Sequence, residues 1–207
     1  MSKLNSKLRW CDDHIVDFEW GDAPNMKDGG RRRLNGEGLP KKPWLFLILE
    51  SPHKNEFKGA DESLHGPARG ITGKYISKYL HQILESKSLE LKSEDMLNKI
   101  KQCRGLVIMN AIQHQCSEGK GLQDKEGQAR RDNNFIEIWD KAKGKEDFEE
   151  RITRHYRQGD VVVLACTHGT TPGAPLRNRV QKSLEEKKLE IDAIVSHPYS
   201  WFGVAKR

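Results

Sequence analysis

Four short apolar runs constrain the fold of this chain more than any other feature. They are residues 44–49, 106–109, 161–166 and 191–195. Each run is bounded by charged residues or glycine and is too short to form a buried helix. Because their apolarity is continuous rather than alternating, the runs are typical of strands that are covered on both faces.

Helical patterns lie between these runs. They cover residues 71–84, 135–142, 147–157 and 175–187. The apolar side chains of residues 71–84 fall near one helical face, and Pro175 suits the first turn of the last helix. Strands that alternate with helices indicate a parallel sheet with right-handed crossovers. We therefore predict an α/β fold, a three-layer α/β/α sandwich around a central, mainly parallel sheet of four strands.

The first 42 residues differ in composition from the rest. Glycine and proline residues gather at positions 29–40, around the Arg31–Arg33 run. This turn-rich composition predicts an irregular arm over residues 1–42, followed by a single domain over residues 43–207. The three arginines are compatible with either a phosphate contact or a solvated loop.

Composition narrows the environment and the partners. The longest apolar run, residues 44–49, is far too short to cross a membrane, and the N-terminus has no hydrophobic signal core. We therefore expect a cytoplasmic protein with no membrane partner. The net charge of +6 permits a nucleic-acid partner without requiring one.

The cysteine spacing argues against a metal centre. Cys11, Cys103, Cys116 and Cys166 are at least 13 residues apart, and no two form a C-x-x-C pair. A zinc ribbon or a clustered iron–sulfur motif needs closer spacing. We expect free thiols, no metal and no cofactor.

Polar residues follow each of the four apolar runs. Glu50 and His53 follow the first run, Asn110 the second, His168 the third and His197 the fourth. The carboxyl ends of parallel strands meet at one edge of a sheet, where α/β proteins bind their ligands. A carboxylate, an amide and several imidazoles should therefore converge on one site.

Each of these residues also has a simpler interpretation. Glu50 follows five apolar residues, so it is either a buried base or a strand-end glutamate that points to solvent. Asn110 can read a base edge or occupy a turn. His197 precedes Pro198 in an extended position, where a lone histidine is more often structural.

The order of four segments adds a resemblance. Residues 49–53 (LESPH) together with 66–76 (GPARGITGKYI), residues 107–112 (VIMNAI) and residues 196–200 (SHPYS) occur in that order. They resemble the signature motifs of the uracil-DNA glycosylase superfamily, most closely its bacterial and archaeal branch. Residues 160–169 are similar to the apolar strand that precedes the last motif. The resemblance spans residues 44–202.

The resemblance implies a DNA glycosylase that flips one nucleotide out of the helix and hydrolyses its N-glycosidic bond without a cofactor. It assigns catalysis to Glu50 and His197. The carboxylate would stabilise positive charge on the sugar and orient water, and a neutral imidazole would stabilise the departing base. Asn110 resembles the residue that reads the base edge.

Further positions are expected to contact DNA. The loop around Gly66, Gly70, Gly73 and Lys74 resembles one that approaches DNA closely. Tyr199, Ser200 and Trp201, with Phe202, lie where the family carries an intercalating loop, although aromatic residues there can also pack against the sheet. Arg177 and Arg179 fit either a backbone phosphate or a solvated helix face.

The departures from the family pattern bear on the substrate. Leu49 replaces a glycine and His53 replaces glycine or tyrosine, while Ala68 and Arg69 stand where the family has an aromatic ring. Loss of that ring removes a stacking surface worth about 1–3 kcal/mol per base, and Arg69 adds donors. The iron–sulfur ligands of the closest branch are absent as a set.

We therefore expect excision of a bulky or modified base, for example a phage-modified cytosine in antiviral defence, by a monomer that binds DNA and no small-molecule cofactor. The alternatives are a non-catalytic DNA-binding module of the same fold, an ordinary uracil-excising repair enzyme, and a nucleotide-processing α/β enzyme outside this superfamily.

Overall fold

A mixed sheet forms the centre of the molecule. The computed structural model describes residues 10–34, 38–57, 66–86, 90–91, 94–117, 124–170 and 175–204. Within them the sheet has seven strands in the order β2-β1-β5-β3-β6-β7-β4. Its parallel part consists of β5 (Leu106–Asn110), β3 (Leu45–Leu49), β6 (Val161–Leu164) and β7 (Ala193–Ile194). These strands coincide with the four apolar runs, which confirms the α/β fold and its parallel centre.

The prediction of four strands is wrong in number. Short antiparallel strands extend the sheet: β1 (His14–Val16) pairs with β5, β2 (Arg31–Arg33) pairs with β1, and β4 (Glu90–Leu91) pairs with β7. Each has only two or three residues. Strands this short carry no readable alternation of side chains, so the sequence pattern does not reveal them.

The prediction of an irregular arm over residues 1–42 is also wrong in part, because described residues of this region belong to the sheet and the core. All three residues of β1 are buried, and Leu39 belongs to the core. Arg31 in β2 donates from Nε to His14 Nδ1 at 3.0 Å, and Arg33 lies 3.2 Å from the Asp12 carboxylate. The arginine run is therefore an edge strand with intramolecular partners rather than a solvated loop.

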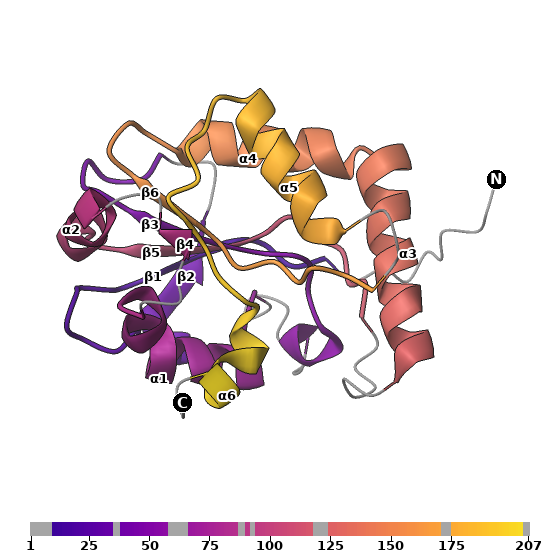
Figure 1. Cartoon of the computed structure of the whole chain (residues 1–207), viewed down its shortest axis with the longest axis horizontal. Helices are drawn as coiled ribbons and strands as arrows, with labels where there is room; N and C mark the ends of the chain where they lie inside the picture. Colours follow the sequence, from indigo (N-terminus) through magenta and orange to yellow (C-terminus); the bar gives the residue numbers. More distant parts are fainter. Residues whose placement is uncertain are drawn as a thin grey trace.

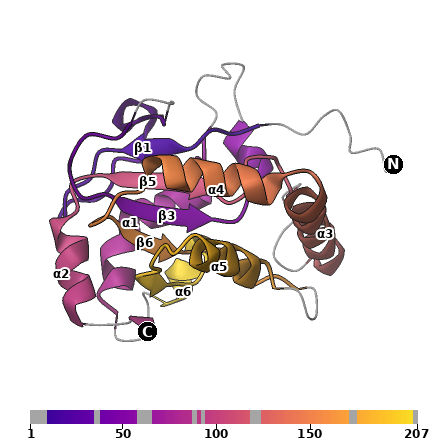
Figure 2. The same ribbon diagram turned by 90° about the horizontal axis from the view of Figure 1, so that it is seen from above.

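Helices cover both faces of the sheet, which gives three layers (Figure 1). One face carries α3 (Lys125–Lys141), α4 (Gly144–His155) and α5 (Leu176–Glu186); the other carries α1 (Ile71–Leu84), α2 (Glu94–Gln102) and α6 (Trp201–Val204). Short 3-10 helices are η1 (Asp28–Gly30), η2 (Lys54–Phe57) and η4 (Pro198–Ser200). In Figure 2 the strands β1, β5, β3 and β6 follow one another from the top of the view downward.

The double covering explains the continuous apolarity of β3. Phe46 and Ile48 pack into the core cluster beneath α3, α4 and α5, whereas Leu45, Leu47 and Leu49 pack into the cluster against α1 and α2. Successive side chains of a strand point to opposite faces, so a strand buried on both sides needs apolar residues at every position. No helix in the described ranges is long and apolar enough to span a membrane.

Candidate functional site

A pocket of about 530 Å³ opens at the carboxyl ends of the parallel strands. The chain leaves β3 toward α1 on one face and leaves β6 toward α5 on the opposite face. Ligands of open α/β sheets bind where the connections after two neighbouring strands run to opposite faces of the sheet. Glu50 directly after β3 and Thr167 and His168 shortly after β6 line the pocket. The predicted meeting of strand ends is therefore present.

Only part of the predicted site lines this pocket. The residues that do are Glu50, His53, Gly70, Arg177, His197, Tyr199 and Ser200. The residues that lie outside its lining are Gly66, Ala68, Arg69, Gly73, Lys74, Asn110 and Trp201. The first set includes both predicted catalytic residues. Glu50 follows β3, the first parallel strand along the chain, and His197 follows β7, the last one.

Glu50 is held from two sides. Its side chain is buried, and Oε2 accepts a hydrogen bond from the Thr167 backbone N–H at 2.7 Å. The Arg131 Nη1 atom lies 3.6 Å from Oε1. The backbone donor and the guanidinium hold the carboxyl group in one orientation in the pocket wall.

Arg131 is itself anchored by a second carboxylate. Its Nε donates to Asp132 Oδ1 at 2.8 Å. Asp132 is fully buried and accepts hydrogen bonds from the backbone N–H and the hydroxyl of Thr170. These hydrogen bonds, from Thr170 above all, hold the pKa of the Asp132 carboxyl below its usual value against the opposing effect of burial. The chain Thr170–Asp132–Arg131 thus positions the cation beside Glu50.

His197 is arranged as a neutral hydrogen-bond donor. Burial lowers the pKa of its imidazole, and the nearby Arg131 lowers it further, while Glu50 opposes them. Its Nδ1 accepts a hydrogen bond from the Tyr199 backbone N–H at 3.2 Å. A neutral imidazole that accepts at Nδ1 carries its proton on Nε2. His197 can therefore donate from Nε2 to an oxygen or nitrogen acceptor.

Two further pocket residues have simple structural roles. Ser200 donates from its hydroxyl to the His197 backbone oxygen at 2.8 Å and so closes the turn that presents the imidazole. Arg177 donates from Nε to the Cys166 backbone oxygen at 3.1 Å. Arg179, by contrast, lies outside the pocket lining, where it is half-buried and ion-paired with Asp140 at 2.7 Å.

Glu56 is a pocket residue that the sequence motifs do not reveal. It lies in η2 and is only 4% exposed, and its Oε1 accepts a hydrogen bond from the Ala68 backbone N–H at 2.9 Å. Burial raises the pKa of the Glu56 carboxyl to about 8, although the Ala68 N–H and the charge of Arg31 oppose this. At neutral pH the group is therefore largely protonated and can donate a hydrogen bond.

This raised pKa predicts a pH-dependent stability. Between the ordinary value of 4.5 and about 8, the folded protein holds a proton at Glu56 that the unfolded chain has released. The free energy of unfolding should therefore fall as pH rises, by about 1.4 kcal/mol per pH unit from this group. The free energy of unfolding can be measured in urea at pH 5.5 and 7.5. Its decrease between these two pH values should be about 2–3 kcal/mol smaller for Glu56→Gln than for the wild type.

The exposed Glu150 provides the matched control. Glu150→Gln should keep the full pH dependence of the wild type. An unchanged pH dependence in Glu56→Gln would show that the carboxyl group of Glu56 ionises normally in the folded protein.

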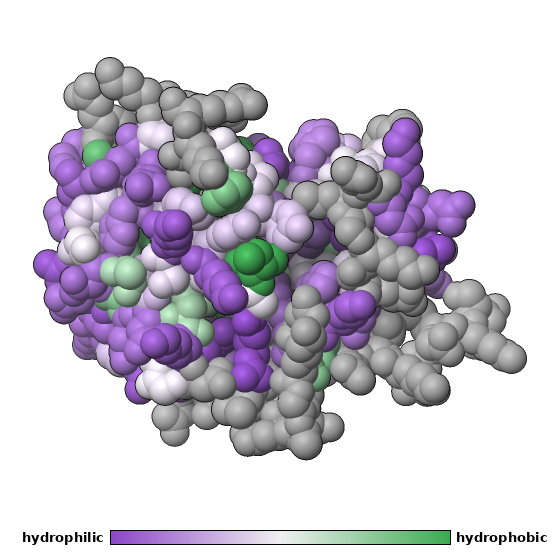
Figure 3. All heavy atoms as spheres, turned by 90° about the horizontal axis from the view of Figure 1, so that it is seen from below, coloured by the Kyte–Doolittle hydropathy of each residue, from purple (hydrophilic) through white to green (hydrophobic). Residues whose placement is uncertain are grey.

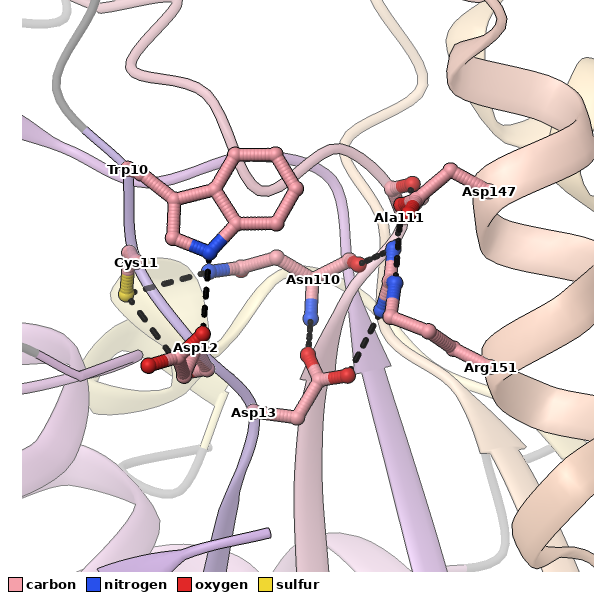
Figure 4. Close-up of polar contacts among 8 residues, drawn as sticks. All are labelled: Trp10, Cys11, Asp12, Asp13, Asn110, Ala111, Asp147 and Arg151. Atoms are coloured by element: carbon pink, nitrogen blue, oxygen red, sulfur yellow. Dashed lines mark hydrogen bonds and ion pairs between the residues drawn. The ribbon is translucent and has the colours of Figure 1, made fainter. Parts of the chain in front are cut away.

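Asn110 does not line the pocket. It is 1% exposed, its backbone N–H donates to Asp13 Oδ1 at 3.2 Å, and its Nδ2 lies 4.0 Å from Cys11 Sγ (Figure 4). Its amide side chain also interacts with the carboxyl group of Glu56. The predicted role of direct base reading is not supported, because the segment that leads into β1 covers this strand end.

The ion pair between Arg151 and Asp13, next to Asn110, has a structural role. Arg151 Nη1 lies 2.6 Å from Asp13 Oδ2, and its Nη2 donates to the backbone oxygens of Asn110 and Ala111 at 3.1 and 3.3 Å (Figure 4). Arg151 Nε also donates to Asp147 at 2.8 Å. These contacts tie α4 to the end of β5 and to the segment before β1.

Several predicted DNA contacts are buried packing positions instead. Trp201 is fully buried and its indole N–H donates to the Ser196 backbone oxygen at 2.7 Å, so it cannot act as a wedge. A Cβ at Gly73 would lie 1.9 Å from the Ala68 oxygen, and one at Gly66 would lie 2.3 Å from the His14 ring. These two glycines allow loop packing within the protein. Ala68 is 1% exposed.

The remaining predicted positions lie outside the pocket but closer to the surface. Arg69 is half-buried and does not line the pocket, so its expected contribution of donors to a base pocket is not supported. Lys74 is exposed on α1, as a DNA contact requires.

Arg131 was missed because the first half of α3 has no apolar periodicity. The pattern predicts a helix only from residue 135, whereas α3 begins at Lys125. The signal that could have found it is the N-cap: Asp124 accepts from the Gly127 backbone N–H at 2.9 Å, and Glu126 occupies the first turn. Helix initiation at Asp124 would have brought Arg131 to the same sheet edge as Glu50.

Neither similarity to known proteins nor a cluster of ligating side chains adds to this description of the site. Protein-family models, curated proteins and solved structures contain no match to this chain. The four cysteines are buried and form no disulfide in the structure. Among the described residues, no group of three or more His, Cys, Asp or Glu side chains could hold a metal ion.

Proposed function

We propose that this protein is a monofunctional DNA glycosylase with a uracil-DNA glycosylase-like fold, which binds a flipped nucleotide in the pocket and hydrolyses its N-glycosidic bond. The observation that carries the proposal is that Glu50 and His197, from the first and last of the resembling motifs, line one pocket and are each held by a backbone N–H. The pocket volume falls within the range of about 300–1,000 Å³ typical of small-molecule sites.

The chemistry follows from the two side chains. As the bond between C1′ and the base breaks, positive charge develops on the sugar and negative charge on the base. The Glu50 carboxylate stabilises the sugar and accepts a proton from the water whose oxygen attaches to C1′. The base leaves with the bonding electron pair, and the His197 Nε2–H stabilises its developing charge through a hydrogen bond.

The pocket lining supports a modified base as the substrate. Among the described residues that line the pocket, Tyr199 is the only Phe, Tyr or Trp. The lining also includes the polar side chains of His53, Glu56 and Arg131. A base that carries extra hydrogen-bonding groups could make additional polar contacts with this lining that plain uracil cannot make. The proposed setting is antiviral defence against modified phage DNA in the cytoplasm.

A substrate panel tests this specificity. DNA containing uracil, hypoxanthine or bulky modified cytosines is incubated with the protein, and abasic sites are detected by alkaline strand cleavage. We expect abasic sites at a modified cytosine and at least tenfold fewer at uracil, since about 1.4 kcal/mol of additional hydrogen bonding to the modified base gives a tenfold ratio. Abasic sites from uracil alone would contradict the modified-base specificity.

A further inference from the structure

A cluster of aromatic and apolar side chains, three exposed and one half-buried, lies beside the pocket. It consists of Ile71 and Tyr75 on α1, Tyr199 on η4 and Phe202 on α6, and we call it the rim surface. Phe202, Tyr199 and Ile71 are 42, 41 and 39% exposed. The rings of Tyr75 and Phe202 are stacked at 6.0 Å, and Tyr199 lies 6.3 Å from Tyr75. Figure 3 shows apolar side chains among hydrophilic ones on the side of the molecule that carries α1 and α6.

Positive charge borders these side chains. Lys74 and Lys78 are exposed on α1, one helical turn apart and adjacent to Ile71 and Tyr75. The 14 residues of α1 contain no Asp or Glu. A partner that presents both flat apolar groups and negative charge would match this combination.

The rim surface is continuous with the pocket. Ile71 and Tyr199 belong to the pocket lining as well as to the cluster. A polymer with one unit in the pocket would therefore pass its neighbouring units over Tyr199, Tyr75 and Phe202.

We propose that the rim surface binds single-stranded DNA next to the nucleotide that occupies the pocket. Unpaired bases offer free faces to aromatic rings, and their phosphates can pair with Lys74 and Lys78. The bases of a duplex are already stacked, so they could not use a surface of this kind. The identity of the nucleotide in the pocket rests on the proposed function, but the preference for a single strand does not.

Binding of unmodified oligonucleotides tests the surface without any base excision. Fluorescence anisotropy compares 5′-fluorescein-labelled dT20 with a labelled 20-base-pair duplex at 50–200 mM salt. We expect tighter binding of dT20. Tyr199→Ala and Phe202→Ala should each weaken it at least about fivefold, since stacking on one ring contributes that much or more.

Lysine substitutions supply the second measurement. In the double variant Lys74→Gln with Lys78→Gln, the slope of log affinity against log salt should decrease in size by about 1.4, because each phosphate contact on a single strand contributes about 0.7. Lys182→Gln, on the exposed face of α5, is the matched control and should leave the slope unchanged.

Other outcomes overturn the proposal. Tighter binding of the duplex would do so, as would dT20 binding that is unaffected by Tyr199→Ala and Phe202→Ala. A dimer in sedimentation that dissociates on Phe202→Asp would show instead that the rim surface joins two copies of the chain. Because dT20 contains no excisable modified base, failure here leaves glycosylase activity to be judged separately.

Discussion

Glu50→Gln should reduce base excision at least about 100-fold while leaving the fold intact. The amide is close in shape to the carboxylate and can still accept the Thr167 N–H at the Oε2 position, so the pocket wall should remain in place. It lacks the negative charge that stabilises the sugar and cannot take a proton from water. Losses of 10²–10³ are typical when such a group is removed. Single-turnover kinetics with the responsive substrate from the panel measure this effect.

The control for this prediction is a glutamate far from the pocket. Glu185 is exposed on α5, where it accepts from Gln181 at 3.0 Å. Glu185→Gln should excise at the wild-type rate. If Glu50→Gln also retained the wild-type rate, with unchanged thermal unfolding, the assignment of Glu50 to catalysis would be wrong.

Arg151→Met should destabilise the protein by about 3–5 kcal/mol. It leaves Asp13 buried at 3% exposure without the guanidinium that lies 2.6 Å away, and it removes donors from the Asn110 and Ala111 oxygens. An uncompensated buried charge causes losses of this size. Urea unfolding at pH 7 measures the change in free energy.

Two companion variants separate the buried charge from general packing. Asp147→Asn removes the half-exposed partner of Arg151 and should cost no more than about 1 kcal/mol. Asp13→Asn in the Arg151→Met background should recover part of the loss, because the amide is neutral. Equal destabilisation by Asp147→Asn and Arg151→Met would contradict the importance given to the Asp13 pair.

Much of the fold could be predicted because its central elements are regular. The helix expected over residues 71–84 matches α1, and the four apolar runs mark the parallel strands. The edge strands could not be predicted because β1 and β2 have three residues each and β2 is entirely arginine. Their formation depends on pairing with β5 and with each other, which is a tertiary effect.

The site could be predicted only as far as topology determines it. Glu50 and His197 follow parallel strands, so the sheet brings them to one edge whatever the loops do. Asn110 is the last residue of such a strand, but the unpredicted β1 segment covers it. Glu56 lies in a 3-10 helix without periodicity, and its burial depends on contact with Ala68. Monomeric state and DNA binding remain predictions.

Mass spectrometry of the reaction products tests the central claim most directly. A short oligonucleotide with the responsive base of the panel is incubated with the wild type and with Glu50→Gln. The account predicts release of the intact free base together with an unbroken strand in which a hydroxyl group replaces that base, with the wild type only. If folded wild-type protein binds the DNA yet leaves every base of the panel attached, the protein is a binding module and the proposed glycosylase function is contradicted.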